Sequence, residues 1–232
     1  MEALLPASFF ALDGFTHAPL FALDAPVWEA LGTRLDDYLA AWADWTIASP
    51  LPSGVHLLEG RISIGRGCRV EPGAVLAGPL IIGDECEIRT GAYVRGRVVL
   101  GRHCIVGAHS EVKSAVFLDG ARAPHQNYVG DSILGREVNL GAGTILSNVK
   151  NVGGEITVRC GESTRSTGMR KLGAVLGDRC KTGCNTVTNP GTLMGPGSVT
   201  YPNATVRAGL YPPGTMIKVR QAQQQTVITV RH

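Results

Sequence analysis

Residues 64–112 read IGRGCRVEPGAVLAGPLIIGDECEIRTGAYVRGRVVLGRHCIVGAHSEV, and this stretch decides the fold. An apolar residue returns at every sixth position, and a glycine often follows it. The apolar positions are Ile64, Val70, Leu76, Ile82, Ile88, Val94, Leu100, Val106 and Val112. A six-residue repeat is typical of a β-helix, in which each hexad forms one short strand and one bend.

Three cysteines set the length of one coil. Cys68, Cys86 and Cys104 are eighteen residues apart, which is the length of three hexads. If three hexads close one triangular coil, these small side chains stack in an interior column with about 4.8 Å between coils. The sequence therefore predicts an all-β parallel β-helix of about seven coils. Buried, reduced thiols of this kind suit a cytoplasmic protein.

The bulk composition argues against several classes of partner. The net charge of the 232 residues is only +3, and Lys and Arg are scattered rather than clustered. We therefore expect no nucleic acid as a partner. We also expect no membrane, because no apolar stretch reaches the length of a transmembrane helix. No Lys or Arg precedes Arg34, which is unlike a signal peptide.

The repeat divides the chain into three parts. Residues 1–54 are not repetitive, and we expect an N-terminal helical extension with one amphipathic helix over Val27–Trp45, packed on an end or a face of the β-helix. Hexads occupy residues 55–214, except that the pattern fails at about 149–173, which predicts an inserted loop near the functional face. Residues 215–232 are expected to form a C-terminal tail.

The eighteen-residue coil brings distant polar residues together. Arg95 and Lys113 each follow the leading residue of a hexad and are eighteen apart, so we expect them one coil apart on one face. Two bare cations about 5 Å apart repel by on the order of 3 kcal/mol at an effective dielectric near 20, so the pair either faces solvent or holds an anion.

A histidine is expected beside residues without bulk. His125 and Ala142 occupy the third place of hexads on successive coils, so His125 should lie against Gly141–Gly143 and leave room for a ligand. The alternative is a surface histidine satisfied by a carbonyl group. Tyr128, Asn139 and Asn148 are expected to converge on the same neighbourhood.

The stretch from Glu111 to Asn148 carries the motif E-V-K-(x11)-H-Q-N-Y-V-G-D-S-(x3)-R-E-V-N-L-G-A-G-T-(x3)-N. It resembles the acetyltransferase domain of the bifunctional N-acetylglucosamine-1-phosphate uridyltransferase/glucosamine-1-phosphate acetyltransferase family. It is more similar still to the archaeal sugar-1-phosphate nucleotidylyltransferase/acetyltransferase form, which shares the RKLGA segment of residues 170–174. The resemblance implies a left-handed β-helix and a homotrimer with sites between subunits. It also implies acetyl-CoA as donor and an amino-sugar 1-phosphate such as glucosamine 1-phosphate as acceptor, with no metal required for acetyl transfer.

The resemblance also assigns expected roles to single residues. His125 matches the general base, a role that typically contributes about 10²–10⁴-fold to the rate. The positions that match acceptor contacts are Arg95 and Lys113 for the phosphate, Tyr128, Asn139 and Asn148 for the sugar and amine, and Lys171 from a neighbouring subunit. The positions expected to contact coenzyme A are Ala142, Cys184, Lys218 and Arg220.

Several departures from the family leave alternatives open. Cys184 stands where the bacterial enzymes place a serine near the thioester, and a thiol donates a weaker hydrogen bond. Leu31–Arg34 resembles the glycine-rich loop of the relatives' nucleotidyltransferase domain only faintly, so we expect neither that domain nor nucleotidyltransferase activity in this chain. A metal-dependent hydratase of the γ-class carbonic anhydrase type would need three histidines, and His103 and His109 do not stack with His125. A catalytically silent sugar-phosphate or nucleotide-sugar binding protein, or a scaffold subunit, is the second hypothesis.

Overall fold

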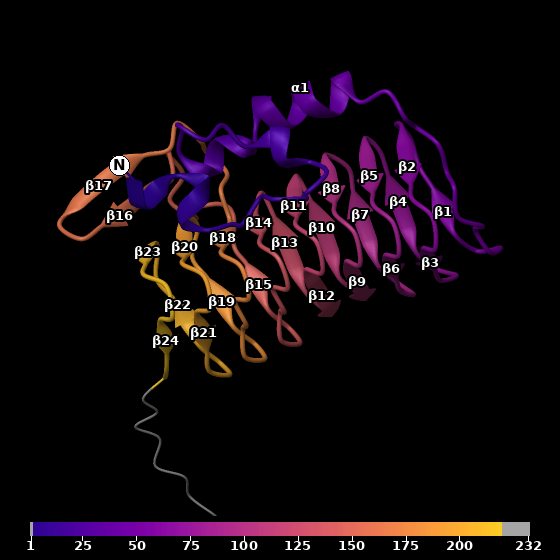
Figure 1. Cartoon of the computed structure of the whole chain (residues 1–232). Helices are drawn as coiled ribbons and strands as arrows, with labels where there is room; N and C mark the ends of the chain where they lie inside the picture. Colours follow the sequence, from indigo (N-terminus) through magenta and orange to yellow (C-terminus); the bar gives the residue numbers. More distant parts are fainter. Residues whose placement is uncertain (1, 220–232) are drawn as a thin grey trace, which may run out of the picture.

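The structure is a computed structural model that describes residues 2–219. It confirms the parallel β-helix predicted from the hexads and the left hand implied by the family resemblance, with three sheets forming the faces of a triangular prism and their strands crossing those faces (Figure 1). Each strand pairs in parallel with the strand one coil further along, as Val94 does with Val112.

Two faces of the prism carry eight strands each, and the bridge from Ile47 to Ile64 adds a further turn, so the helix has about nine turns rather than the seven expected. Face A consists of β2 (Ile62–Ile64), β5 (Leu80–Ile82), β8 (Val98–Leu100), β11 (Ala115–Phe117), β14 (Ile133–Leu134), β18 (Ala174–Leu176), β20 (Thr192–Met194) and β23 (Gly209–Tyr211). Face B consists of β1 (His56–Leu57), β4 (Val75–Ala77), β7 (Tyr93–Arg95), β10 (Glu111–Lys113), β13 (Tyr128–Gly130), β15 (Ile145–Leu146), β19 (Val187–Thr188) and β22 (Thr205–Val206).

Face C is less regular than the other two. Its strands are β3 (Arg69–Val70), β6 (Glu87–Ile88), β9 (Ile105–Ala108), β12 (Arg122–His125), β21 (Val199–Thr200) and β24 (Met216–Ile217). Single bridging residues, Asn139 and Lys181, continue the face between β12 and β21. The β-helix begins before residue 55, since Ile47 already bridges to Ile64, and it continues past residue 214 into β24.

The interior column of cysteines is present as predicted. The thiols of Cys68, Cys86 and Cys104 are buried, and they donate to carbonyl oxygens of the next coil at 3.1, 3.0 and 3.2 Å. The neighbouring thiol and then burial raise the pKa of Cys68, and the Cys104 thiol raises that of Cys86. Burial raises the pKa of Cys180 to about 12. All six cysteines are free.

The N-terminal segment contains less α-helix than the sequence suggests. Its elements are the 3₁₀ turns η1 (Glu2–Leu4), η2 (Pro6–Ser8), η3 (Ala18–Leu20) and η4 (Val27–Ala30), and the helix α1 (Thr33–Ala41). The single helix expected over Val27–Trp45 is interrupted because Gly32 has a φ of 63°, which lies outside helical geometry, and it ends where Trp42 becomes extended.

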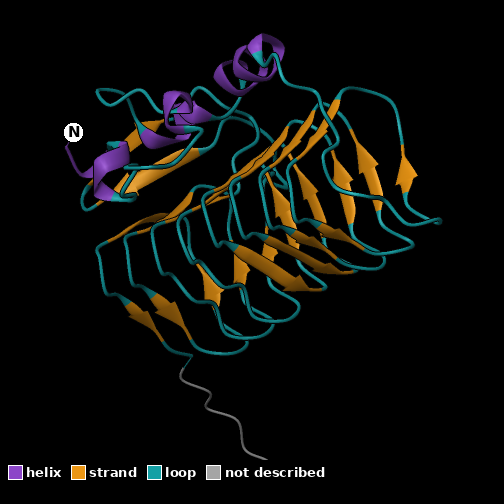
Figure 2. Cartoon of the chain, turned by 45° about the vertical axis from the view of Figure 1, so that its right-hand side comes forward, coloured by secondary structure: helices purple, strands orange, loops and turns teal. Residues whose placement is uncertain are grey.

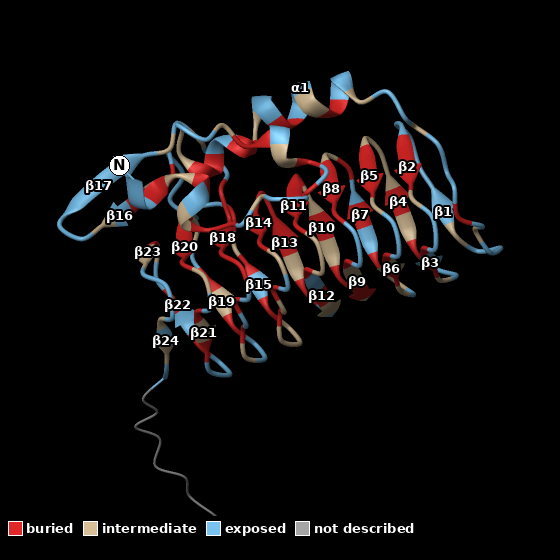
Figure 3. Ribbon diagram, in the orientation of Figure 1, coloured by how far each residue is buried: buried red, intermediate tan, exposed pale blue. Residues whose placement is uncertain are grey.

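This segment covers face A along the length of the prism (Figures 1 and 2). The central residues of the face A strands, such as Ile81, Val99 and Val116, point outward, yet they are buried in one cluster with Phe9, Leu35 and other N-terminal side chains. Figure 3 shows buried residues on both sides of this contact. Each such aliphatic side chain stabilises the fold by about 1.5–3 kcal/mol. The extension therefore packs on a face of the β-helix and not on its end.

The predicted loop at 149–173 leaves the corner between faces B and A. It contains an antiparallel hairpin of β16 (Thr157–Cys160) and β17 (Ser163–Ser166). Ile156, Val158 and Leu172 join the apolar cluster of the N-terminal segment. The loop is thus fixed against the N-terminal segment as well as against the β-helix.

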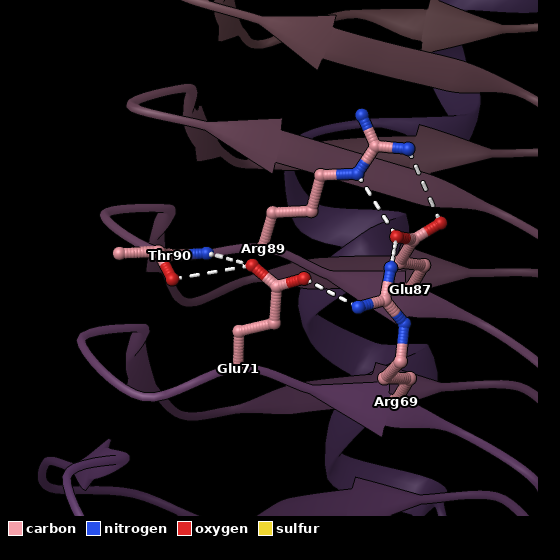
Figure 4. A network of polar contacts seen from close by, with 5 residues as sticks. All are labelled: Arg69, Glu71, Glu87, Arg89 and Thr90. Atoms are coloured by element: carbon pink, nitrogen blue, oxygen red, sulfur yellow. Dashed lines mark hydrogen bonds and ion pairs between the residues drawn. The ribbon is translucent and has the colours of Figure 1, made fainter.

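Face C carries a ladder of ion pairs on its outer surface (Figure 4). Arg69 pairs with Glu71 at 2.5 Å and with Glu87 one coil away, and Arg89 Nε lies 3.0 Å from Glu87. Glu71 also accepts from the backbone N–H of Thr90 at 2.8 Å. These side chains are satisfied by each other, so this part of face C offers no unpaired charge for a ligand. Across residues 2–219, no helix has the length and apolar composition that crossing a bilayer requires.

Candidate functional site

The outer surface of face B carries Arg95 and Lys113, which the eighteen-residue spacing predicted to be neighbours. Val94 lies opposite Val112, and Lys113 lies opposite Gly130, so the residues after the two valines, Arg95 and Lys113, occupy the same place on successive coils. This is the arrangement that the eighteen-residue period predicts.

Neither cation is bare, which corrects the expected repulsion. Arg95 Nη1 lies 2.7 Å from Glu111 Oε1, and this hydrogen bond raises the pKa of Arg95. Lys113 Nζ lies 2.9 Å from Asp131 Oδ2. The side chain of Arg95 is 45% exposed, whereas that of Lys113 is 17% exposed. An incoming anion would thus meet an accessible guanidinium and a more sheltered ammonium, each held by an acid.

Asp131 is the hub of a buried polar network on this face. The same Oδ2 that pairs with Lys113 accepts from Asn148 Nδ2 at 2.5 Å. Tyr128 donates from its hydroxyl to Asn148 Oδ1 at 3.4 Å, a long contact that continues the chain to the surface. Asp131 and Asn148 are both buried. The network therefore fixes which way the amide of Asn148 faces.

Gly130 makes room for this network. A Cβ at this position would lie 2.8 Å from both Asn148 Nδ2 and the hydroxyl of Tyr128. Sequence reasoning did not single out Asp131 or Glu111. Both stand inside the E-V-K and G-D-S parts of the motif, but only the fold shows that they pair with Lys113 and Arg95.

His125 ends β12 at the corner between faces C and B. Its backbone carbonyl accepts from the N–H of Gly143 at 3.0 Å, and its own N–H donates to Asn127 Oδ1 at 3.1 Å. Asn127 in turn donates to the carbonyl of Gly141 at 2.8 Å. The backbone of His125 is therefore locked against the glycine stretch, as the stacking predicts, and the residue is exposed at this corner.

The residues expected to contact coenzyme A follow the same corner to later coils. The carbonyl of Ala142 accepts from the N–H of Asn185 at 2.8 Å, so Cys184 lies one coil beyond Ala142, and its residue is exposed. Lys218 lies still further along, with Nζ 5.0 Å from the centre of the Tyr201 ring. Arg220 lies outside the described residues.

Asn139 does not join the face B network within one chain, which corrects the expected convergence. It bridges Arg122 and Lys181 on face C and lines a hollow of about 580 Å³ there. The physical reason is its place in the hexad: β12 and the bridge at Asn139 belong to face C, whereas Tyr128 and Asn148 follow the turn onto face B. One chain thus offers two groups of candidate residues on adjoining faces.

Lys171 follows the hairpin and is exposed. The two residues after it contact the face B network through their backbone: the N–H of Leu172 donates to the carbonyl of Asn148 at 3.1 Å, and the N–H of Gly173 donates to the carbonyl of Asp131 at 2.8 Å. Over residues 2–219, no three His, Cys, Asp or Glu side chains are grouped so that they could hold a metal ion.

The chain is similar to known proteins over the β-helix. The family model named GMPPB C-terminal domain matches residues 76–189. A bifunctional sugar-1-phosphate nucleotidylyltransferase/acetyltransferase from Sulfurisphaera tokodaii is 41% identical over 100 residues, which are 43% of this chain and 25% of that protein. The bifunctional protein GlmU of Methanococcus vannielii is 36% identical over 100 residues, or 43% of this chain and 24% of that one.

A solved structure, the acetyltransferase domain of PglB from Neisseria gonorrhoeae, aligns with 72% of this chain and 52% of its own at 10% identity and a TM-score of 0.24. This chain spans about a quarter of the length of the curated relatives it matches. The resemblance stated from the motif is confirmed: the β-helix of this chain is similar to the GMPPB C-terminal domain and to part of the sugar-1-phosphate nucleotidylyltransferase/acetyltransferases.

Proposed function

We propose that this chain is a hexapeptide-repeat acetyltransferase that moves the acetyl group of acetyl-CoA to the amine of an amino-sugar 1-phosphate, such as glucosamine 1-phosphate. The observation that carries the proposal is the network of Lys113, Asp131, Asn148 and Tyr128 beside Arg95 on face B. These residues lie in the stretch matched by the family model, and the relative from Sulfurisphaera tokodaii is named for acetyl transfer.

The phosphate of the acceptor is assigned to Arg95 and Lys113. A dianionic phosphate competes with Glu111 and Asp131 for these cations, and charge-assisted bonds to phosphate are among the strongest that side chains make. Arg95 is the more accessible partner. Tyr128, Asn148 and Asn139 are assigned to the sugar and its amine, with Lys171 contributed by a neighbouring subunit.

His125 is assigned as the general base. It takes a proton from the amine as the nitrogen lone pair forms a bond to the thioester carbonyl carbon. The tetrahedral intermediate collapses, the C–S bond breaks and coenzyme A leaves with its sulfur protonated, so that atoms and protons balance. Asn148, held by Asp131 at 2.5 Å, is assigned to orient the amine for this attack.

The donor is assigned to the corner that runs from Ala142 to Cys184 and on to Lys218. Arg220 is assigned to the donor from the sequence alone. The exposed thiol of Cys184 would face the thioester and donate a weak hydrogen bond to the developing oxyanion. The free thiols of the chain suit a reducing, cytoplasmic location.

A homotrimer would complete the site. Face A is covered by the N-terminal segment, whereas face B exposes large side chains such as Tyr93 and Ile145 beside the candidate site. If face B of one copy packs near face C of the next, the network around Asn148 meets the His125 and Asn139 surface of a neighbour. A contact between different faces of neighbouring copies is heterologous, and heterologous contacts around a threefold axis close into a ring.

A second candidate function is a catalytically silent binding or scaffold subunit. Two observations favour it: Cys184 stands where a serine was expected, and both cations are already paired with acids. In that case the chain would bind a sugar phosphate or nucleotide sugar without turnover.

The test is direct detection of the acetylated product. The full chain is mixed with acetyl-CoA and a panel of amino sugars and their phosphates, and products are followed by mass spectrometry, since the exposed Cys184 would contribute to a thiol assay. We expect acetylation of an amino-sugar 1-phosphate, its loss in His125→Ala, and its retention in the matched control His103→Ala. Absence of any product from a folded trimer would contradict the enzyme, and ligand binding that persists without turnover would favour the scaffold.

A further inference from the structure

A cavity of about 590 Å³ lies between three segments that are far apart in the sequence. Its walls come from the N-terminal segment, from the loop before β18 and from two corners of the β-helix between faces B and A. Neither Arg95 nor Lys113 lines it, and neither does His125. The cavity is therefore distinct from the phosphate and base positions assigned to acetyl transfer, although Asp131 and Lys171 contribute to its walls.

The charged side chains of this cavity are unequal in sign. The lining holds four cations, Arg34, Arg97, Arg170 and Lys171, and two acids, Glu29 and Asp131. Two of these six charges are already paired: Arg97 with Asp36 of α1 at 2.6 Å, and Asp131 with Lys113 at 2.9 Å. In the part of the chain that the structure describes, Arg34, Arg170 and Lys171 form no ion pair within 4 Å. The unpaired charges of the lining are thus three cations and Glu29, which gives a net charge of +2.

The walls of the cavity are fixed. Arg97 also donates from Nη2 to the carbonyl of Gly32 at 3.2 Å, so it ties α1 to the β-helix. A Cβ at Gly32 would lie 3.8 Å from Met169 Cε, which places the loop against the start of α1. The carbonyl of Met169 accepts from the N–H of Ile156 at 2.8 Å. The cations are therefore carried on anchored backbone, where a ligand has little ordering to impose.

We propose that this cavity binds a phosphorylated small molecule that carries about two negative charges. Its volume lies within the roughly 300–1,000 Å³ of small-molecule sites, and a hollow lined by one sign of charge concentrates counter-ions. Trp28 and Leu31 in its wall are buried and present no aromatic face on which a base would stack. Recognition therefore rests on the phosphoryl group, and a sugar monophosphate and a nucleoside-diphosphate sugar both supply it.

The site stands whether or not the chain transfers acetyl groups, because Arg34, Arg97 and Arg170 are not assigned to the acceptor, and Lys171 is the one cation that the two sites have in common. Binding is measured by isothermal titration calorimetry on the full chain without acetyl-CoA. The probes are inorganic phosphate, glucose 1-phosphate and UDP-glucose. We expect binding that weakens as salt rises, and at least a tenfold higher Kd in the double variant Arg34→Ala/Arg170→Ala. The probe that binds most tightly distinguishes the monophosphate from the diphosphate.

Two controls decide between outcomes. Arg165→Ala removes an exposed arginine of the same loop that does not line the cavity, and it should keep the wild-type Kd. Arg34→Lys/Arg170→Lys keeps the charge and should retain binding, which separates charge from folding. The proposal is overturned if no probe binds at millimolar concentration, if the double alanine variant binds as wild type does, or if Arg165→Ala weakens binding equally.

Discussion

Asp131 holds Asn148 by a 2.5 Å hydrogen bond while its same oxygen pairs with Lys113. Two residues that the motif assigns to different parts of the acceptor thus share one buried carboxylate. Asp131 contacts no assigned substrate atom itself, so it is a positioning residue. Asp131 directly follows the end of β13, and Gly130 before it leaves space for the amide.

Replacing Asp131 tests this arrangement. Asp131→Asn removes the charge that aligns Lys113 and weakens the hydrogen bond that Asn148 Nδ2 donates to this side chain. We expect kcat to fall by about 10–100-fold, since a misplacement of about 1 Å can cost that much. The KM for the acceptor should change less, because Arg95 remains. Steady-state kinetics give the split, and Asp131→Glu should restore part of kcat. Asp37→Asn, an exposed change on α1, is the control. Equal kcat in Asp131→Asn and wild type would show that the network has no catalytic role.

The cysteines should differ in reactivity by their place in the coil. Cys68, Cys86, Cys104 and Cys180 are buried, and Cys184 is exposed. We expect one thiol of the native chain to react rapidly with a disulfide reagent, with Cys160 slower because burial raises its pKa. Coenzyme A should protect the fast thiol. Peptide mapping that finds another residue labelled first would place the donor groove elsewhere.

Cys184→Ser tests the oxyanion assignment separately. A hydroxyl donates a stronger hydrogen bond than a thiol, so we predict a higher kcat in this variant with little change in the Kd for coenzyme A. Cys184→Ala serves as the comparison, because it removes the hydrogen-bond donor from this side chain. A serine variant no faster than the alanine variant would exclude this side chain from the oxyanion contact.

The buried His17 of the N-terminal segment should make the stability of the fold depend on pH. Burial lowers the pKa of His17 to about 4, while Asp119 opposes the shift. Because the unfolded chain binds this proton near pH 6.5 and the folded chain only near pH 4, stability is complete above about pH 6.5 and falls as the pH drops toward 4, by up to about 3 kcal/mol. Urea unfolding at pH 7, 5.5 and 4.5 measures the slope, and His17→Asn should flatten it. An unchanged slope in that variant would assign the effect to other groups.

The cover of face A should contribute strongly to stability. Leu35 of α1 is fully buried against this face, so Leu35→Ala should lower the free energy of unfolding by about 2–5 kcal/mol. Leu23 lies on the same segment but is 69% exposed, and Leu23→Ala should change stability by under about 0.5 kcal/mol. Equal effects of the two changes in guanidinium unfolding would mean that the segment does not stabilise the β-helix.

The sequence predicted what depends on the repeat. The positions of Cys68, Cys86 and Cys104 were predicted because one period of eighteen fixes every stacked neighbour. The same arithmetic placed Arg95 beside Lys113 and His125 beside Gly143. Periodicity does not say what lies around a corner, and for that reason it missed the carboxylates of Glu111 and Asp131 and did not separate Asn139 on face C from the network on face B.

The N-terminal segment shows a second limit. The apolar spacing in Val27–Trp45 suggested one helix, but the structure breaks it at Gly32, where Arg97 of the β-helix binds the Gly32 carbonyl and Asp36. No pattern within the segment encodes that partner. For the same reason the cavity between α1 and the loop could not be foreseen from either stretch alone.

The central claim is that face B holds the acceptor phosphate while the corner at Ala142 holds the donor. The measurement that tests it most directly is a crystal structure of the full chain with coenzyme A and glucosamine 1-phosphate. We predict the phosphate within hydrogen-bond distance of Arg95 and Lys113, the amine facing Asn148 and a His125 imidazole, and the pantetheine arm along Ala142 and Cys184. A phosphate bound away from both cations, or coenzyme A bound away from that corner, would contradict the account.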